Sequence, residues 1–274
     1  MIKVAILLAT WNSSRYLGEL LDSILTQTYT DWELHVRDDG STDNTLEILT
    51  HYAHKDGRIQ IVSSRGNIGP KMGFMNLLEQ IEAELYMFCD HDDVWFPSKI
   101  EDSVNLMCSQ PDWKSEPLVV GTDLCVVDAQ LNVLADSFWK QQHYALSLCN
   151  NKYFHLVYNN IPGCTMLFNQ LARKVALPCP QEAQMHDSWL VASVLWNGGR
   201  VLPLAMATIF YRQHQDNVLG ATQVPSYYTQ LKRLRQLFHK TKKEWHAVRH
   251  IAHLGFLRFF IIKMYYMILL HHKS

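Results

Sequence analysis

The chain has 274 residues, a net charge of −1 at pH 7, and 48% hydrophobic against 19% charged residues. This length allows one large α/β domain or two smaller ones, and the apolar content is sufficient for a sizeable core, which excludes a largely disordered chain. The six cysteines lie 15 to 24 residues apart, without a close pair. This spacing argues against both a zinc site and a disulfide framework, and it predicts reduced thiols in the cytosol.

Charge is distributed unevenly along the chain. Residues 218–274 contain ten lysines and arginines but a single acid, Glu244, which gives them a net charge of +9, whereas residues 1–217 carry −10. We therefore predict a first domain over residues 1–220 and a basic, amphipathic C-terminal helical extension over residues 221–274. The first ten residues lack the basic start, long apolar stretch and cleavage site of an export signal, and we expect them to form a strand.

Strands and helices are predicted to alternate along the first domain. Apolar residues recur at helical spacing in the segments that separate short aliphatic runs, and the pattern indicates an α/β fold with a mostly parallel central sheet flanked by helices. The helix expected last in this domain is the mostly apolar HDSWLVASVLW. The predicted strands are VAILLAT, WELHVRDDG, RIQIVSS, ELYMFC, LVVGTDLCVVD, CTMLFN and RVLPLAMATIFYRQH.

Three carboxylates follow the fourth predicted strand. Asp90, Asp92 and Asp93 lie within four residues of one another, directly after ELYMFC. Neighbouring carboxylates repel one another unless a cation or hydrogen-bond donors offset their charge, and Mg²⁺ and Mn²⁺ prefer such oxygen ligands. The competing interpretation is that these acids cap the next helix or lie solvated in a turn.

A second acidic strand end lies at Asp38 and Asp39. In open α/β sheets, ligands bind outside the carboxyl ends of strands, and an acid after the second strand can accept hydrogen bonds from a base or ribose. A simple turn in DDGSTDNT is the alternative. This segment is not a calcium loop, because Asn44 stands where that loop needs glycine and Thr50 where it needs glutamate. The chain has neither a G-x-G-x-x-G fingerprint after its first strand nor a P-loop.

Taken in order, three segments of the chain resemble glycosyltransferase family 2, the inverting sugar-nucleotide-dependent transferases of GT-A fold. The segments are LLATWNSSRYLGELLDSILTQTYTDWELHVRDDGSTDNT, NIGPKMGFMNLL and FCDHDDVW, and the resemblance covers roughly residues 1 to 217. DHDDVW and YRQHQDNV are most similar to bacterial rhamnosyltransferase-like members. The Q-x-x-R-W motif of processive members is absent from the sequence, so polymer synthesis is not expected.

The resemblance implies a donor site at the strand ends. Asp38 and Asp39 would lie at the nucleobase, with Asp39 the better match, and Asp90 and Asp92 would form the D-x-D motif around the metal. The segment around Asn67 matches the loop and helix beside the donor sugar or ribose, although a glycine turn and a polar helix face would explain it equally. The full set of residues implied to bind the sugar nucleotide is Thr10, Asn12, Asp38, Asp39, Asn67, Gly69, Asn76, Asp90 and Arg212.

The same resemblance implies a metal site, an acceptor site and a catalytic base. Asp90, Asp92 and His214 would hold Mg²⁺ or Mn²⁺, with Asp93 as a supporting neighbour, and Gly163 and Cys164 would line the acceptor site. Asp187, at the start of the helix HDSWLVASVLW, would be the base. A base is needed because an acceptor hydroxyl is a poor nucleophile at neutral pH. Helix capping is the other explanation for an acid at this position.

The expected function is therefore that of a metal-dependent inverting glycosyltransferase. It would move a sugar from a UDP- or dTDP-sugar to a saccharide or lipid-linked saccharide, in the biosynthesis of bacterial surface polysaccharide such as lipopolysaccharide. The alternatives are a sugar-phosphate nucleotidyltransferase and a non-catalytic carbohydrate-binding protein.

The C-terminal extension resembles an interfacial helix pair. A membrane span needs about 20 apolar residues, whereas Arg258 and Lys263 interrupt the apolar segment IAHLGFLRFFIIKMYYMILLHH. We therefore expect a cytoplasmic protein that lies on the inner face of the cell membrane, attracted by anionic lipid, and no nucleic-acid partner. The alternative is that this segment packs on the catalytic domain or on a second subunit.

Overall fold

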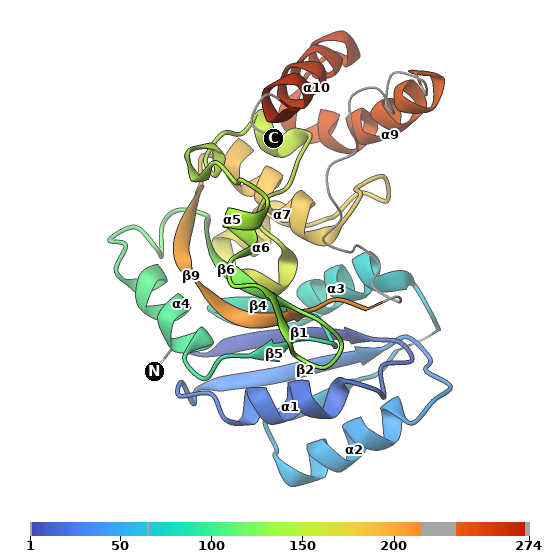
Figure 1. The fold of residues 1–274 in the computed structure, drawn as a ribbon, viewed down its shortest axis with the longest axis vertical. Coiled ribbons are helices and arrows are strands. Elements are labelled where there is room, and N and C mark those ends of the chain that lie inside the picture. The colour runs from blue at the N-terminus through green and yellow to red at the C-terminus, as the bar shows by residue number, and fades with distance from the viewer. Residues whose placement is uncertain (1, 65, 215–233, 272–274) are drawn as a thin grey trace.

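The computed structural model describes residues 2–64, 66–214 and 234–271 (Figure 1). The described part is built on a nine-stranded sheet in which the strands follow the order β3-β2-β1-β4-β8-β6-β9-β5, with β7 paired to β6. The predicted boundary between residues 220 and 221 lies outside the described residues, so the division into two parts stays a prediction.

The first half of the chain forms the parallel part of the sheet. β1 pairs with β2 and β4, and β2 pairs with β3, all in parallel. Thr10 lies beside Asp38, and Leu8 lies beside Cys89, so the carboxyl ends of three strands meet at one edge. The elements are β1 (Val4–Thr10), α1 (Leu17–Leu25), β2 (Trp32–Asp38), α2 (Thr45–Lys55), β3 (Ile59–Val62), α3 (Gly69–Gln80) and β4 (Leu85–Cys89).

The second half of the first domain makes the sheet mixed rather than mostly parallel. β6 and β9 pair in parallel, but β8 is antiparallel to both β4 and β6, β5 is antiparallel to β9, and β7 is antiparallel to β6. The elements are β5 (Val94–Trp95), α4 (Lys99–Cys108), β6 (Leu118–Val127), β7 (Val133–Ala135), α5 (Phe138–Gln141), η1 (Leu146–Leu148), η2 (Phe154–Leu156), η3 (Gly163–Thr165), β8 (Met166–Asn169), α6 (Gln170–Ala176), α7 (His186–Trp196) and β9 (Arg200–Arg212).

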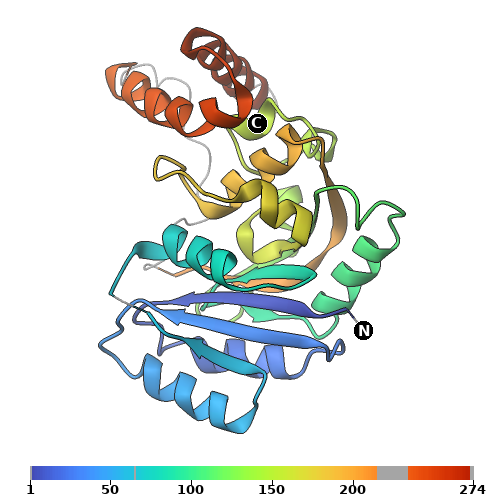
Figure 2. The same ribbon diagram turned by 180° about the vertical axis from the view of Figure 1, so that it is seen from behind.

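Helices cover both faces of the sheet, as Figures 1 and 2 show. Val4, Ile6 and Leu8 of β1 belong to the core shared with α1, α2 and α4, whereas Ala5 and Leu7 belong to the core shared with α3, α6 and α7. A central strand buried on both faces requires a continuous apolar run, which is why VAILLAT does not alternate with polar residues. The six cysteines are free thiols.

The C-terminal extension forms two helices, α9 (Leu234–Ala252) and α10 (Phe256–His271), that pack beyond α7 (Figures 1 and 2). Ala247, Val248 and Phe259 form an apolar cluster with Leu156 of η2, so the alternative of packing on the first domain is confirmed. Within the described residues, no single helix has the length and hydropathy needed to cross a membrane. The segments Lys240–Ala252 and Phe256–Leu269 meet that requirement only together, with a bend of 109°.

Candidate functional site

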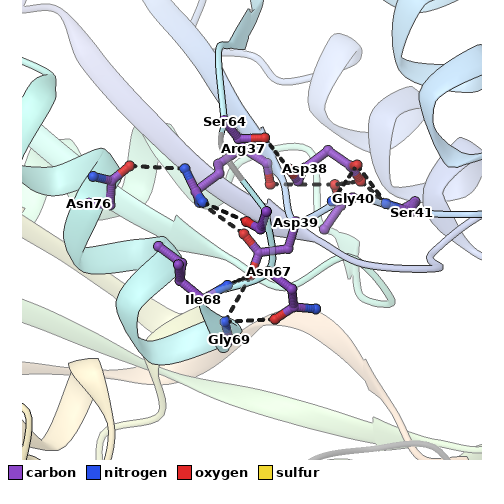
Figure 3. Close-up of polar contacts among 12 residues, drawn as sticks. Arg37, Asp38, Asp39, Gly40, Ser41, Ser64, Asn67, Ile68, Gly69 and Asn76 are labelled. Atoms are coloured by element: carbon purple, nitrogen blue, oxygen red, sulfur yellow. Dashed lines mark hydrogen bonds and ion pairs between the residues drawn. The ribbon is translucent and has the colours of Figure 1, made fainter.

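The first acidic strand end, at Asp38, is a tightly hydrogen-bonded turn (Figure 3). One carboxylate oxygen of Asp38 accepts hydrogen bonds from the Thr10 hydroxyl at 2.9 Å and from the Ser41 hydroxyl, and the other accepts from the backbone N–H groups of Gly40 and Ser41. Asn12 extends this network, because its side-chain oxygen accepts from Thr42 N–H at 2.9 Å. The turn interpretation of DDGSTDNT is therefore correct for Asp38, whose predicted contact with a nucleobase stays a prediction.

Asp39 fastens the loop before α3 to the end of β2. One of its oxygens accepts from Arg37 Nε at 2.9 Å, and the other accepts from the N–H groups of Ile68 and Gly69 at 3.0 and 2.9 Å. The same arginine donates to the side-chain oxygen of Asn76 at 3.2 Å (Figure 3). Gly69 has a φ of 77°, a conformation that favours glycine.

The structure thus brings the residues predicted for one side of the donor together at one edge of the sheet. Asn67 takes part through its side-chain oxygen, which accepts from Gly69 N–H at 2.9 Å. Sequence reasoning missed Arg37, which is 4% exposed and joins Asp39, Asn76 and the Gly66 carbonyl. A single arginine inside the predicted strand WELHVRDDG, next to two acids, was the available signal.

The second acidic strand end is an electrostatically crowded cluster. Asp90 is half-buried, and burial, with the charges of Asp92 and Asp187, raises the pKa of Asp90 to about 7. Asp93 is fully buried, and neither of its oxygens has a hydrogen-bond partner among the residues that the structure describes, although the Cys164 thiol lies within 4.8 Å. Burial and the neighbouring acids raise the pKa of Asp93 well above its usual range.

A buried lysine lies against this cluster, and sequence reasoning missed it. Lys99 is fully buried at the start of α4, where its Nζ donates to the Cys164 carbonyl at 2.9 Å and lies 4.8 Å from the Trp95 ring centroid. Burial lowers the pKa of Lys99 to about 8, although the neighbouring cysteines and acids raise it. The residue therefore supplies a fixed positive charge beneath the acids. A lysine next to the apolar VWFP segment gives only a weak sequence signal, because most lysines are exposed.

The end of β9 closes the cluster from the other side. Antiparallel pairing of β5 with β9 carries His214 to Asp92, with 2.9 Å between His214 Nε2 and Asp92 Oδ2. Arg212 is 1% exposed, and it donates to the Asp92 carbonyl, the Ala129 carbonyl and Glu19. Arg212 therefore positions the acidic loop relative to α1, and its predicted contact with the nucleotide stays a prediction.

The donor set in this region fits a hard divalent cation. Asp90 is half-buried, and the Asp92 carboxylate lies 2.9 Å from the imidazole of His214. Carboxylate oxygens suit Mg²⁺ or Mn²⁺, and an imidazole nitrogen also suits Mn²⁺. Among the described residues, the three potential ligand atoms that all lie within 4.8 Å of one another belong instead to Asp90, Asp93 and Cys164. Burial, followed by the nearby acids, raises the pKa of the Cys164 thiol well above its usual range, so this side is the less suitable one for a metal.

Asp187 is held in a defined orientation at the start of α7. One oxygen accepts from Asn159 Nδ2 at 3.0 Å and from Gly163 N–H at 3.2 Å, and the other accepts from Ser188 N–H at 2.6 Å. Burial, although opposed by these hydrogen bonds, raises the pKa of Asp187 to about 6. A carboxylate with this pKa is ionised at neutral pH but is a stronger base than an exposed aspartate.

The turn at Gly163 joins Asp187 to the acidic cluster. A side chain at residue 163 would place its Cβ 2.8 Å from His186 Nε2, so only glycine fits there. His186 stacks on Phe74 with 4.2 Å between ring centroids, and burial lowers its pKa to about 3, which makes it a neutral packing residue. The predicted acceptor residues Gly163 and Cys164 thus lie between Asp187 and the acids, but Cys164 is itself buried.

A cleft of about 310 Å³ opens at Asp187. Asp39 and Asp92 do not line this cleft. Tyr211 does, and burial together with the charges of Cys164, Asp93 and Asp90 raises the pKa of Tyr211, so its phenol connects the two regions. The lining residues are Leu124, Phe138, Tyr144, His155, Leu156, Val157, Tyr158, Asn159, Pro162, Ala183, Gln184, Met185, Asp187, Ser188, Trp189, Ala192, Tyr211, Glu244, Ala247 and Val248.

Comparison with known proteins agrees with this geometry. A family model described as Glycosyl transferase family 2 matches residues 5–175, more than half of the chain. A protein described as "Uncharacterized glycosyltransferase RT0329", from Rickettsia typhi (strain ATCC VR-144 / Wilmington), is 30% identical over 186 residues, which are 67% of this chain and 56% of RT0329.

A second relative is the UDP-Glc:alpha-D-GlcNAc-diphosphoundecaprenol beta-1,3-glucosyltransferase WfgD of Escherichia coli. It is 30% identical over 104 residues, which are 38% of this chain and 40% of WfgD. The chain spans about half the length of the curated relatives that it matches first.

Two solved structures share the fold. S. aureus TarS 1–349 in complex with UDP-GlcNAc superimposes with a TM-score of 0.66 and 17% identity, covering 96% of this chain and 70% of that one. The mannosyltransferase PcManGT from Pyrobaculum calidifontis, in complex with GDP-Man and Mn²⁺, gives a TM-score of 0.59 and 17% identity, covering 90% and 64%. The expected GT-A type of α/β fold, followed by a helical C-terminal part, is confirmed.

Proposed function

Since the chain belongs to glycosyltransferase family 2 and is a glycosyltransferase, we propose that it transfers a sugar from a UDP- or dTDP-sugar to a hydroxyl of a saccharide or lipid-linked saccharide, with inversion at the anomeric carbon. The observation that carries the proposal is Asp187, oriented by three hydrogen-bond donors at the mouth of a cleft, with a pKa raised to about 6 by burial. Family membership favours this reaction over the nucleotidyltransferase and the non-catalytic alternatives.

Asp187 is the proposed base. It accepts the proton of the acceptor hydroxyl while that oxygen forms a bond to C1 of the sugar and the bond from C1 to the diphosphate oxygen breaks. The acceptor attacks from the face opposite the leaving group, which inverts the configuration. Two donors, Asn159 and the Gly163 N–H, hold one oxygen of the base, whereas the other oxygen accepts only from Ser188 N–H and keeps a lone pair with which to take the proton.

The departing nucleoside diphosphate gains negative charge as it leaves. We propose that Asp90, Asp92 and His214 hold Mg²⁺ or Mn²⁺ there, and a divalent cation in this position supplies charge stabilisation to the leaving diphosphate. Lys99 adds a fixed positive charge from below. The Mn²⁺ complex of the structurally similar mannosyltransferase and the UDP-GlcNAc complex of TarS support this arrangement at the level of the shared fold.

We further propose that the protein acts in bacterial surface polysaccharide biosynthesis, at the cytoplasmic face of the membrane. The relative WfgD, whose acceptor is a lipid diphosphate saccharide, supports this role. The outward side of α10 supports it physically, because Leu257, Ile261, Tyr265 and Ile268 recur every three or four residues and are 72%, 59%, 59% and 45% exposed. Exposed basic side chains of α9, such as Lys242, would attract anionic lipid.

Product analysis tests the reaction. The full chain is incubated with a panel of UDP- and dTDP-sugars, Mn²⁺ or Mg²⁺, and saccharide acceptors. The proposal expects free nucleoside diphosphate from at least one donor. Pyrophosphate release from a nucleoside triphosphate and a sugar phosphate would instead establish the nucleotidyltransferase.

Membrane contact has its own test. Full-length protein is sedimented with anionic phosphatidylglycerol vesicles and with neutral phosphatidylcholine vesicles at low salt. We expect binding to the anionic vesicles only, reduced in Leu257→Ser/Ile261→Ser. The matched control is Val133→Ser/Leu134→Ser, which removes two exposed apolar side chains from β7 and should leave binding unchanged. Equal recovery with both lipid types, or no recovery at all, would refute the contact.

A further inference from the structure

Helix α9 supplies part of the wall of the cleft that opens at Asp187. Glu244, Ala247 and Val248 line the cleft together with Tyr158, from the segment after η2. The three α9 residues are spaced by three and four positions and therefore share one face of the helix. The C-terminal extension is thus part of the cleft as well as a helix pair packed on the first domain.

Glu244 is an unusual residue for this wall because it is an acid with only 5% of its surface exposed. One of its oxygens, Oε2, accepts from Lys263 Nζ of α10, which is 7% exposed. The other oxygen, Oε1, has no hydrogen-bond partner within the described ranges 2–64, 66–214 and 234–271, yet it is not fully enclosed. The lysine therefore fixes the carboxylate and leaves one oxygen able to accept a hydrogen bond from a ligand in the cleft.

The rest of the lining has the character of a site for uncharged sugar. Aromatic rings, including those of Tyr144, Tyr158 and Tyr211, offer flat apolar faces, and the hydrogen-bonding groups include Asn159 and two carboxylates. No lysine or arginine of the described chain lines the cleft. Burial, and then the charge of Glu244, raises the pKa of Tyr158 to about 12, which is consistent with the two side chains lying close together.

Ligand classes can be separated by these contacts. Sugar hydroxyls donate strongly to a carboxylate, and the C–H face of a sugar ring packs on aromatic rings. An acyl chain at Glu244 would bury that carboxylate oxygen without a donor, which is costly. A uronic acid or phosphate would meet two acids and no compensating cation in the lining.

We propose that α9 forms a second acceptor subsite, in which Glu244 accepts hydrogen bonds from the hydroxyls of an uncharged sugar that neighbours the one attacked at Asp187. The inference rests on the proposed function and deepens it, because it names the acceptor as a neutral saccharide of at least two rings. Any lipid diphosphate carried by the acceptor lies outside the cleft. The C-terminal extension therefore contributes to acceptor choice, whereas the predicted donor contacts all lie in residues before 215.

Binding of defined sugars tests this subsite without requiring turnover. Saturation-transfer NMR is recorded on the full chain with a panel of neutral disaccharide methyl glycosides, their uronic-acid counterparts and the matching monosaccharides. We expect at least one neutral disaccharide to bind, its uronic-acid counterpart to bind at least tenfold more weakly, and Glu244→Gln to weaken the neutral disaccharide about tenfold while leaving the monosaccharide unchanged. Lys243→Gln, an exposed neighbour on α9, is the matched control and should bind as wild type.

A second variant tests the subsite independently, in case Glu244→Gln does not fold. Ala247→Leu fills the cleft without removing a polar group, and it should abolish the preference for disaccharide over monosaccharide. The subsite is refuted if Glu244→Gln weakens monosaccharide and disaccharide equally, if neither variant changes binding, or if uronic-acid disaccharides bind as well as neutral ones. Failure of every donor to react, with disaccharide binding intact, would count against the proposed function and not against the subsite.

Discussion

The acidic edge of the sheet and the cleft at Asp187 are built in opposite ways. At the edge, Asp38, Asp39 and Asp92 are nearly buried, and protein donors or partners already occupy their oxygens. In the cleft, apolar and aromatic side chains form most of the lining, and Asp187 is the half-buried group with a raised pKa. The edge is therefore a rigid polar frame, whereas the cleft is an adaptable surface around one reactive group.

This difference suggests a division of labour. Short local contacts fix the charges at the acidic edge before a ligand binds. Such a site suits a constant ligand such as a nucleoside diphosphate, because preorganised charge costs no reorganisation on binding. A cleft assembled from β6, the segment after η2, α7 and α9 can change its shape with few substitutions, as an acceptor site must when related enzymes use different saccharides. Changes at the edge should therefore affect donor and metal, and changes in the cleft should affect acceptor and proton transfer.

Replacing the base should have the largest effect. Asp187→Asn keeps the size of the side chain but removes the proton acceptor, so kcat for transfer should fall by roughly 10²–10⁴, the usual contribution of a general base. The donor KM should stay near the wild-type value, because the edge is untouched. Initial rates of nucleoside diphosphate release measure both. Glu182→Gln, an exposed acid nearby in the chain, is the control. Near-normal turnover in a folded Asp187→Asn would remove the assigned role.

Removing the metal should have the second-largest effect on transfer, and it should affect only the acidic edge of the sheet. Chelation with EDTA should abolish transfer, and Mn²⁺ or Mg²⁺ should restore it. Asp92→Ala should lose about 10²–10³ in rate and resist rescue at ordinary metal concentrations, because a divalent cation contributes several kcal/mol to a developing charge. Mn²⁺ binding, followed by electron paramagnetic resonance, should weaken in parallel while acceptor binding is unchanged. Full activity in the presence of EDTA would show that the acidic edge supports sugar transfer without a cation.

Breaking the buried ion pair between Glu244 and Lys263 should lower the stability of the protein and have little effect on the reaction of the donor. Lys263→Met leaves Glu244 buried without its partner, which costs about 3–5 kcal/mol and should lower Tm by about 10 °C. Differential scanning calorimetry measures the shift. Glu244→Gln/Lys263→Met removes both charges and should recover most of the loss, and the exposed Lys243→Met should be neutral. If the single variant is as stable as wild type, α9 and α10 do not depend on this pair.

The same contrast explains what could be predicted from the sequence. The acids at Asp38, Asp39, Asp90 and Asp92 follow short aliphatic runs, and parallel strands place such ends at a common edge, so local pattern was sufficient. The antiparallel pairing in the second half of the sheet was not predicted, although strands were expected where β8 and β9 lie. The strands β5 and β7 themselves were missed, because β5 has only two residues and β7 three, too short for any periodicity. Its β6 was predicted, since a ten-residue buried strand leaves a clear apolar run.

Residues that act through tertiary contacts gave only weak signals. Lys99 and Arg37 are buried cations whose partners come from distant segments. Because lysine and arginine are usually exposed, the sequence did not indicate that these two are buried. Glu244 was recognised only as the single acid of a basic segment, and its place in the cleft depends on how α9 packs on α7. The membrane interpretation of that segment considered composition alone, which does not distinguish the inward side of a helix from its outward side.

The pH dependence of transfer should give the smallest effect but the sharpest separation of the two regions. Burial raises the pKa of Asp187 to about 6, so kcat should fall about tenfold for each pH unit below 6 as the base becomes protonated, and it should level off above pH 7. Burial and neighbouring acids raise the pKa of Asp90 to about 7, but a bound divalent cation favours the ionised form and lowers that value.

Rate profiles at low and saturating Mn²⁺ distinguish the two carboxyls. The inflection near pH 7 should move to lower pH as Mn²⁺ rises, because it belongs to the edge, whereas the inflection near pH 6 should stay in place, because it belongs to the cleft. Asp187→Glu should shift only the second. If both inflections move together with metal, Asp187 shares the cation with the edge, and the division between a donor frame and an acceptor cleft is wrong.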